Sequence, residues 1–436
     1  MPSVDTASAI LESLDALGVT HVLYCPGSRS APFAYALEAG SFRGDARPIL
    51  DERGAGFAAV GLARTGALPA VVVTSGTAVA ELAPAVLEAS HARLPLLLLT
   101  ADRPGELRGV GASQATDQSG FFGTHVRASL DLEPQEASPS LVGHLTRAVA
   151  AACGAPGSAP GPVQVNVAFR DPLTPVRPAC DCGDEVGASF VPCPTRVLAA
   201  PAVPVPWEDV VGPAAAGLIV AGEGASPRAR EWSEASGFPL LAEPASGAWS
   251  GGGVTPFEQT LVASSLGSEV DAVVVIGRPT LSRPIQALLA RPDVRVVVVD
   301  PHAPWVDISG NAAVVVADLE PAREPIRAAQ AEWAARVREA ARDAGERIES
   351  LLASGSGRTM LDLARAVAAS TSGPLVLGAS NPVRAFDLAV PTLEGRVVHS
   401  NRGQAGIDGT IATAVGVCLG SGYAGEASAS EGERVT

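Results

Sequence analysis

Short, unbroken apolar runs recur along the first part of the chain, and segments with helical spacing of apolar residues lie between them. The runs are HVLYC, AVVVTSG, PLLLLTA and VQVNVA, and residues 76–91 are an example of the helical segments. Strands that are buried on both faces read as continuous apolar runs, and strands that alternate with helices form parallel sheets. The sequence therefore predicts an α/β fold built from βαβ units.

The same alternation returns after a Pro-rich stretch, and again near the end of the chain. With 436 residues, the chain is long enough for two or three domains. We expect three consecutive parallel-sheet domains. Their expected bounds are 1–178 for the first domain, 179–207 for a linker, 208–350 for a central α/β domain and 351–436 for the start of a third domain.

The charged residues exclude several classes of function. The net charge is −15, which opposes binding to nucleic acid, so we expect no nucleic-acid partner. The chain contains no lysine, and this excludes both a Schiff-base lysine and a GxxxxGK[ST] phosphate loop. Arginine is therefore the only fixed cation that an anionic substrate could meet.

The cysteines and histidines do not have the spacing of a metal site. Of the six cysteines only Cys180, Cys182 and Cys193 cluster, without a fourth ligand nearby, and the six histidines are dispersed. We therefore expect no metal ligands among them. The N-terminus does not read as a secretory signal, and the apolar runs are shorter than the ~20 residues of a membrane span. We expect a cytoplasmic protein with no membrane span.

Polar residues follow five of the predicted strands. These junctions are residues 26–29, 74–77, 101–103, 379–381 and 400–403. Serine and threonine at such points can simply cap helices. Arginine recurs at three of the five, however, and guanidinium groups beside helix N-termini suit carboxylates and phosphates. Ligands of parallel sheets bind at the carboxyl ends of the strands, so the sequence predicts an anion site there.

Two further features leave alternatives open. Glu52 follows the predicted strand RPIL and precedes a Gly/Ala-rich helix, where a glutamate can merely complement the helix dipole. The segment GEGASP, residues 222–227, begins like a dinucleotide-binding fingerprint but has proline in place of the third glycine. A nicotinamide-dependent oxidoreductase therefore stays as an alternative.

Five stretches together resemble a known family of thiamine-diphosphate enzymes. They are CPGSRSAP, DERGAGFAAVGLAR, VVTSGTAVAELAPAVLEA, TADRPGELRGVGASQATDQSGFFG and SNRGQAGIDGTIATAVG. They look like the 2-succinyl-5-enolpyruvyl-6-hydroxy-3-cyclohexene-1-carboxylate synthases of menaquinone biosynthesis. The resemblance implies three domains of the thiamine-diphosphate type. It also implies that 2-oxoglutarate is decarboxylated and that its succinyl unit adds to isochorismate in a conjugate addition.

The resemblance assigns roles around the cofactor. The glutamate that matches Glu52 hydrogen-bonds the aminopyrimidine ring of thiamine diphosphate and favours the tautomer that activates the cofactor. The residues Ser75, Gly76 and Thr77 would line the pyrimidine side. Ile407, in AGIDG, would hold the cofactor in its bent shape.

The resemblance also assigns residues to the two dicarboxylate substrates. Those that would face isochorismate are Ser28, Arg29, Arg103, Gln114 and Arg283. Those that would hold carboxylates are Ser380, Arg384 and Arg402, with the two arginines favoured for 2-oxoglutarate. The family often has asparagine at the position of Ser113 and a basic residue at that of Ser282, so the neighbouring contacts are less securely implied.

The resemblance is less complete near the C-terminus. The family continues with a strand ending in Gly-Asp and a downstream asparagine, which hold Mg²⁺ and the cofactor's diphosphate. The last residues, GERVT, resemble the start of that strand, so we expect a truncated third domain whose metal ligands lie outside this sequence. An inactive fragment that binds carboxylates or a full-length partner is the alternative. The resemblance further implies a homodimer or homotetramer.

Overall fold

The computed structural model describes residues 3–134, 138–175, 192–197, 201–324, 326–355, 359–393 and 395–422. The described residues fall into two compact units. The first comprises residues up to 197 together with 411–422, and the second comprises 201–410. Cys180, Cys182 and most of the expected linker lie outside the described residues, and the four expected domain bounds stay predictions.

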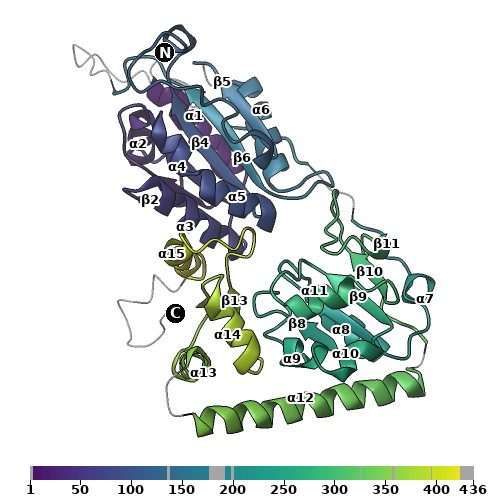
Figure 1. Ribbon diagram of the computed structural model, residues 1–436. Coiled ribbons are helices and arrows are strands. Elements are labelled where there is room, and N and C mark those ends of the chain that lie inside the picture. Colours follow the sequence, from purple (N-terminus) through teal and green to yellow (C-terminus); the bar gives the residue numbers. More distant parts are fainter. Residues whose placement is uncertain are drawn as a thin grey trace. The chain divides into compact units, whose positions relative to one another are not determined.

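The first unit contains a parallel sheet of six strands in the order β2-β1-β3-β4-β6-β5. The strands are β1 (His21–Tyr24), β2 (Asp45–Pro48), β3 (Pro69–Val73), β4 (Leu96–Asp102), β5 (Ala128–Leu132) and β6 (Pro162–Ala168). The helices are α1 (Ser3–Ala16), α2 (Ala31–Glu38), α3 (Glu52–Arg64), α4 (Thr77–Glu81), α5 (Ala83–Ala92) and α6 (Pro139–Ala152). Helices cover both faces of the sheet (Figure 1).

Alternate side chains of the sheet belong to separate apolar cores on its two faces. Leu97 and Leu99 of β4 pack with α1 and α6, whereas Leu96 and Leu98 pack with α3 and α5. Both central strands β4 and β6 are buried throughout, which confirms the prediction from their unbroken apolar runs. The helix expected over residues 76–91 is instead two helices, because Pro84 has no amide hydrogen to continue the first one.

The last described helix, α15 (Thr410–Gly420), belongs to the first unit from Ile411 onward. It packs directly on α3 through glycines of both helices. A Cβ atom on Gly61 would clash with the carbonyl oxygen of Thr413, and a Cβ atom on Gly416 would clash with that of Ala58. The backbones of the two helices therefore meet with no space for a side chain between them.

The replacement of Gly61 by alanine tests this helix contact. We expect Gly61→Ala to destabilise the protein by about 1–3 kcal/mol, because the added methyl group must push α15 away from α3. The control is Gly143→Ala in α6, where the nearest atom to an added Cβ is Arg147 Nη1 at 3.9 Å. There we expect a gain of about 0.5–1 kcal/mol from helix propensity alone. Urea unfolding followed by circular dichroism measures both, and equal effects would contradict the packing.

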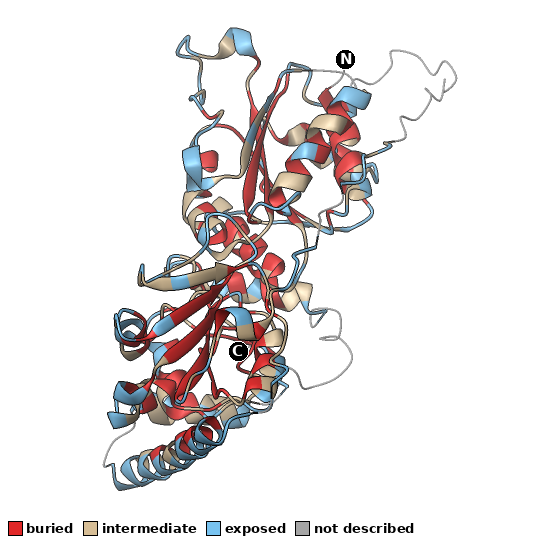
Figure 2. Ribbon diagram, turned by 90° about the vertical axis from the view of Figure 1, so that its right-hand side faces the viewer, coloured by how far each residue is buried: buried red, intermediate tan, exposed pale blue. Residues whose placement is uncertain are grey.

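The second unit contains a parallel sheet of five strands in the order β11-β10-β9-β7-β8. Its strands are β7 (Gly217–Ala221), β8 (Leu240–Ala242), β9 (Ala272–Ile276), β10 (Arg295–Val299) and β11 (Ala312–Val316). The helices are α7 (Trp207–Val210), α8 (Arg228–Ser236), α9 (Glu258–Val262), α10 (Ser265–Glu269), α11 (Arg283–Leu289) and α12 (Ala328–Ser354). The interior strands β3, β4, β6, β7 and β9 of the two large sheets are buried throughout, whereas β2, β5 and β11 are mostly intermediate or exposed (Figure 2).

A small third sheet follows in the same unit. It pairs β12 (Leu375–Val376) with β13 (Val398–His399) in parallel, and α13 (Met360–Ser370) and α14 (Asn381–Ala389) accompany it. Leu375 and Phe386 belong to the same apolar cluster as Val274 of the central sheet. The three sheets are parallel, so the predicted α/β class is confirmed.

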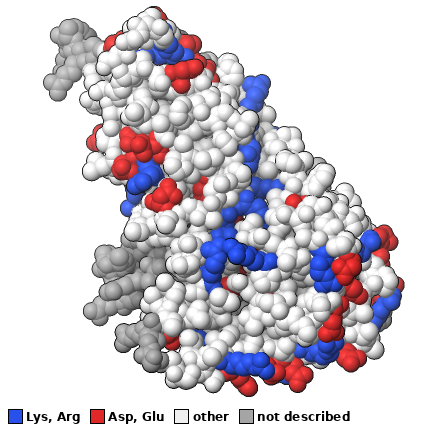
Figure 3. Space-filling view, in the orientation of Figure 1, with Lys and Arg blue, Asp and Glu red and all other residues white. Residues whose placement is uncertain are grey.

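The long helix α12 has one buried face up to Ala344, and residues 345–354 are intermediate or exposed. Trp333, Val337 and Ala341 face the core, while charged residues cover the outer side. On the face drawn in Figure 3 basic and acidic side chains alternate along the lower edge, where α12 lies. Arg336 of α12 pairs with Glu269 of α10 at 2.6 Å. Within the described part of the chain, no helix is both long and apolar enough to cross a membrane.

Candidate active site

The loop after β1 is a tight turn at the point where the strand order of the first sheet reverses. The chain turns from β1 to β2 on one side and to β3 on the other, which is where ligands of such sheets bind. Gly27 lies so close to Thr74, in the loop after β3, that any Cβ atom would clash. The buried Ser30 hydroxyl donates to the carbonyl oxygens of Cys25 and Gly27 at 3.2 and 3.1 Å and braces the turn.

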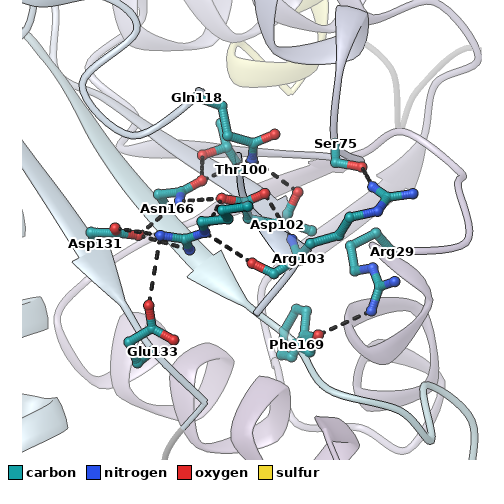
Figure 4. Close-up of polar contacts among 12 residues, drawn as sticks. Arg29, Ser75, Thr100, Asp102, Arg103, Gln118, Asp131, Glu133, Asn166 and Phe169 are labelled. Atoms are coloured by element: carbon teal, nitrogen blue, oxygen red, sulfur yellow. Dashed lines mark hydrogen bonds and ion pairs between the residues drawn. The ribbon is translucent and has the colours of Figure 1, made fainter. Parts of the chain in front are cut away.

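Two arginines lie next to each other beside this turn (Figure 4). Arg29 donates from Nη1 to the carbonyl oxygen of Phe169 at 3.0 Å. Burial lowers the pKa of Arg29, and the positive charge of Arg103 lowers it further, against the opposing effect of Asp171. Two guanidinium groups held close together favour an anion between them. The predicted anion site is thus supported on the first sheet by Arg29 and Arg103.

Arg103 connects the loop after β3 to the loop after β4. Its Nη1 donates to Ser75 Oγ at 2.7 Å and to the carbonyl oxygen of Gln114 at 2.6 Å. Gln114, at a positive φ of 54°, donates in turn from Nε2 to the carbonyl oxygen of Ser75 at 3.0 Å. The structure therefore brings together Arg29, Arg103, Ser75 and Gln114, which the sequence placed in one site. Ser113 is exposed beside Gln114.

Glu52 is the first residue of α3, at the same edge of the sheet. The side chain of Asp51 caps this helix by accepting from the Gly54 amide at 2.8 Å, so Glu52 itself is not needed as the cap. Burial raises the pKa of the Cys25 thiol to about 12, and the negative charges of Glu52 and Asp51 contribute. The half-buried Glu52 carboxylate thus lies near the end of β1. Ser28 and Thr77 are exposed at this edge.

In the second unit, hydrogen bonds of two arginines fix the loop after β13. Arg402 is buried and donates to the carbonyl oxygen of Ala379 at 2.9 Å and to Thr280 Oγ1 at 3.0 Å. Arg278 donates to the carbonyl oxygen of Arg402 at 2.8 Å and pairs with Glu223 at 2.9 Å. Arg278, which the sequence left without a role, therefore positions the main chain of the loop that carries Arg402.

The remaining predicted residues of this unit are exposed. Arg384 lies in the first turn of α14 and donates to the carbonyl oxygen of Ser380 at 2.9 Å. Arg283 begins α11, and Ser282 caps that helix by accepting from the amide of Ile285 at 3.3 Å. A serine rather than a basic residue before Arg283 thus has a structural reason. Ile407 is 67 % exposed.

The glycine-rich segment 222–227 has a structural explanation. A Cβ atom on Gly222 would clash with the main chain of Arg278 and Pro279, so the absence of a side chain is required by packing. The carboxylate of Glu223 is used by Arg278. A search of the described residues finds no group of His, Cys, Asp and Glu side chains that could hold a metal ion.

Three carboxyl groups of the second unit are buried, those of Glu243, Glu258 in α9 and Asp387 in α14. Burial raises the pKa of Glu243 to about 8, that of Asp387 to about 7, and that of Glu258 well above its ordinary value. Asp387 accepts a hydrogen bond from Gln259 Nε2, and both carboxyl oxygens of Glu258 are buried without a hydrogen-bond partner. Burial therefore favours the uncharged form of each of these three carboxyl groups.

The raised pKa values predict a pH dependence of stability. The pKa of an aspartate in the unfolded chain is near 4, whereas burial raises the pKa of Asp387 in the folded protein to about 7. Between these two pH values the folded state therefore binds more protons than the unfolded state. The free energy of unfolding consequently falls as the pH rises through this window. We expect Asp387→Asn and Glu258→Gln to flatten this slope and to add roughly 1–3 kcal/mol at pH 8. Urea unfolding from pH 5 to 8 measures it, with the exposed Glu339→Gln as control. A slope unchanged in both variants would contradict the assignment.

Some polar residues of the site were not singled out from the sequence. Gln118 and Asn166 are buried at the carboxyl edge of the first sheet, where Gln118 Nε2 donates to Asn166 Oδ1 and Asn166 Nδ2 donates to Asp102 Oδ2. One signal was present in VQVNVA, where Gln164 and Asn166 alternate within a strand expected to be buried on both faces. A buried polar residue is informative, because it must be hydrogen-bonded.

Comparison with known families agrees with this geometry. The family model described as "Thiamine pyrophosphate enzyme, N-terminal TPP binding domain" matches residues 4–121. These residues include the loops after β1, β3 and β4 and the start of α3. The first unit therefore contains the N-terminal domain of a thiamine-diphosphate enzyme.

Curated relatives define the family more narrowly. Three of them, each named 2-succinyl-5-enolpyruvyl-6-hydroxy-3-cyclohexene-1-carboxylate synthase, come from Kineococcus radiotolerans, Nocardioides sp. and Mycobacterium leprae. The identities are 44, 41 and 38 %, over 97, 95 and 97 % of this chain and 77, 74 and 77 % of the relatives. The chain belongs to the 2-succinyl-5-enolpyruvyl-6-hydroxy-3-cyclohexene-1-carboxylate synthase family. The resemblance seen in the sequence motifs is confirmed.

Proposed function

We propose that this chain is a thiamine-diphosphate-dependent transferase of menaquinone biosynthesis. It decarboxylates 2-oxoglutarate and transfers the succinyl unit to isochorismate. The observation that supports this most directly is the pair Arg29 and Arg103, held beside the Ser75 loop in a domain of the thiamine-diphosphate type. A nicotinamide-dependent reaction has no comparable support, since residues 222–227 are explained by packing.

The residues around the first sheet fit thiamine diphosphate. Glu52 presents a half-buried carboxylate at a helix N-terminus, and Ser75, Gly76 and Thr77 form the loop after the neighbouring strand β3. The Thr74 hydroxyl is buried without a hydrogen-bond partner at the same place. When bound, the cofactor supplies an electron sink for the decarboxylation. Glu52 would accept a hydrogen bond from its pyrimidine ring, and Ile407 would contact the cofactor through its apolar side chain.

The arginines suit the two dicarboxylate substrates. Arg29 and Arg103 bind isochorismate, helped by Ser28, Gln114 and Arg283. The residues that bind 2-oxoglutarate are Ser380, Arg384 and Arg402. Because the chain has no lysine, every positive charge that orients these carboxylates is a planar guanidinium group, which can bind a carboxylate through two hydrogen bonds.

Two parts of the proposal go beyond the residues described above. We expect Mg²⁺ to neutralise the diphosphate of the cofactor, so that EDTA removes activity and added Mg²⁺ restores it. We also expect a homodimer or a homotetramer, which sedimentation velocity would detect.

The central test is the replacement of Glu52 by glutamine. We expect Glu52→Gln to lower kcat at least about 100-fold, because the amide cannot hold the charge that assists proton transfer on the cofactor. The assay follows isochorismate consumption and carbon dioxide release with 2-oxoglutarate, thiamine diphosphate and Mg²⁺. The control is Glu38→Gln, an exposed glutamate at the end of α2. An unchanged kcat in Glu52→Gln, or no turnover by the unaltered chain, would contradict the proposal.

A second test separates the two substrate sites. We expect Arg29→Met to raise the KM for isochorismate at least about tenfold, because it removes a charge-assisted contact. Its KM for 2-oxoglutarate should stay within about twofold of the original. Arg384→Met should show the reverse pattern. Steady-state kinetics with each substrate varied in turn measures both, and the same KM change for both substrates in either variant would contradict the assignment.

A further inference from the structure

A buried polar group crosses the first sheet within one of its apolar cores. Asn166 of β6 lies in register with Thr100 of β4 on one side and with Asp131 of β5 on the other. Neighbouring strands place such residues side by side on the same face of the sheet. Asn166 and Thr100 have no accessible surface, so their polar atoms must bond to each other or to other protein groups.

The side chain of Asn166 uses all its hydrogen-bonding capacity. Its Oδ1 accepts from Thr100 Oγ1 at 2.9 Å and from Gln118 Nε2 at 2.8 Å. Its Nδ2 donates to Asp102 Oδ2 at 2.9 Å and to Asp131 Oδ1 at 2.8 Å. An amide is the one side-chain group of this size that offers two acceptor and two donor positions in this arrangement.

One arm from Asn166 reaches the loop assigned to the cofactor. Gln118, which is 1 % exposed, also donates to the carbonyl oxygen of Ala101 at 3.0 Å. Its Oε1 accepts from the amide of Gly76 at 3.3 Å. The orientation of the Gln118 amide is fixed by Asn166, because only its NH₂ group can face an acceptor oxygen.

The other arm reaches the arginine assigned to the substrate. Asp102, which is 1 % exposed, accepts from Asn166 through Oδ2 and from the amide of Arg103 through Oδ1 at 2.7 Å. The Arg103 side chain then returns to Ser75 at 2.7 Å. Figure 4 shows Gln118, Asn166, Asp102, Arg103 and Ser75 gathered in one place. The two arms thus form a closed ring of contacts through Asn166.

We propose that Asn166 is a positioning residue that fixes, through Gln118 and Asp102, the relative places of the Gly76 loop and of Arg103. The roles of the Gly76 loop and of Arg103 in binding cofactor and substrate rest on the proposed function, whereas the ring of hydrogen bonds does not depend on it. Asn166 touches neither the cofactor nor a substrate. It acts by making the loop after β3 and the loop after β4 a single rigid unit.

The charges around Asn166 explain why the amide cannot be replaced by a carboxylate. Asp102 and Asp131 both face its NH₂ group, and Glu133 lies nearby on the chain segment after β5. Arg108 is the cation among them and pairs with Asp102 at 3.1 Å and with Asp131 at 2.7 Å. A third carboxylate at position 166 would lose both donated hydrogen bonds and add like-charge repulsion.

The test uses Asn166→Asp, which keeps the shape of the side chain. We expect the KM for isochorismate to rise at least about tenfold at pH 8, and the amide of Gly76 to exchange with deuterium faster than in the unaltered protein. At pH 5.5 protonation of the new carboxyl group restores one donor, so both effects should diminish. If the substitution merely weakened the fold, acidification would restore neither the KM for isochorismate nor the exchange rate at Gly76.

A second variant and a control keep the test decisive if Asn166→Asp does not fold. Gln118→Leu removes the hydrogen bonds between Asn166 and the Gly76 loop. It should accelerate deuterium exchange at the Gly76 amide and change the isochorismate KM less than Asn166→Asp does. Thr146→Val in α6 removes a buried hydroxyl that bonds to the carbonyl oxygen of Val142 at 2.8 Å outside the ring, and should leave both readouts unchanged.

Failure of the inference is distinct from failure of the proposed function. Gly76 exchange and KM values unchanged in the variants that fold would overturn the positioning role, while turnover by the unaltered chain would leave the proposed function in place. If the unaltered chain shows no turnover, the proposed function is wrong, and deuterium exchange alone still decides whether the ring fixes the Gly76 loop.

Discussion

The close contact of Gly27 with Thr74 is the constraint on which the first site depends. It brings the turns after β1 and β3 together at the point where the strand order reverses, and no side chain can separate them. Arg29 and Ser75 lie within two residues of this contact, one on each turn. A parallel sheet delivers all such turns to one edge, so a few loops from distant segments form one site without any long loop.

Sequence periodicity predicted the sheets well but could not predict their register. The apolar runs at β4 and β6 identified buried strands, whereas β5 was missed because ASLDL is short and alternates apolar and polar residues, and only Leu132 of it is buried. The same limit applies to the site. Arg29, Arg103 and Glu52 were proposed from motifs, but Asn166 became meaningful only when register placed it between Thr100 and Asp131. Contacts across strands depend on pairing, which local patterns do not contain.

The two units use arginine in different ways. On the first sheet Arg29 and Arg103 lie side by side and act on each other's charge, although each also donates to a carbonyl oxygen. In the second unit Arg278 donates to the carbonyl oxygen of Arg402 and pairs with Glu223, so it fixes the main chain of a loop. An arginine-rich motif therefore does not by itself indicate a substrate contact. The planar guanidinium group serves equally well to hold a backbone in place.

The glycine contact between α3 and α15 has a consequence for synthesis of the protein on the ribosome. Residues 411–422 complete the first unit, but they emerge only after the whole second unit has been translated. Until then the Gly61 face of α3 lacks its partner and stays open to water or to chaperones. The first unit thus begins its folding earliest, but α3 gains this partner only after residues 411–422 have left the ribosome.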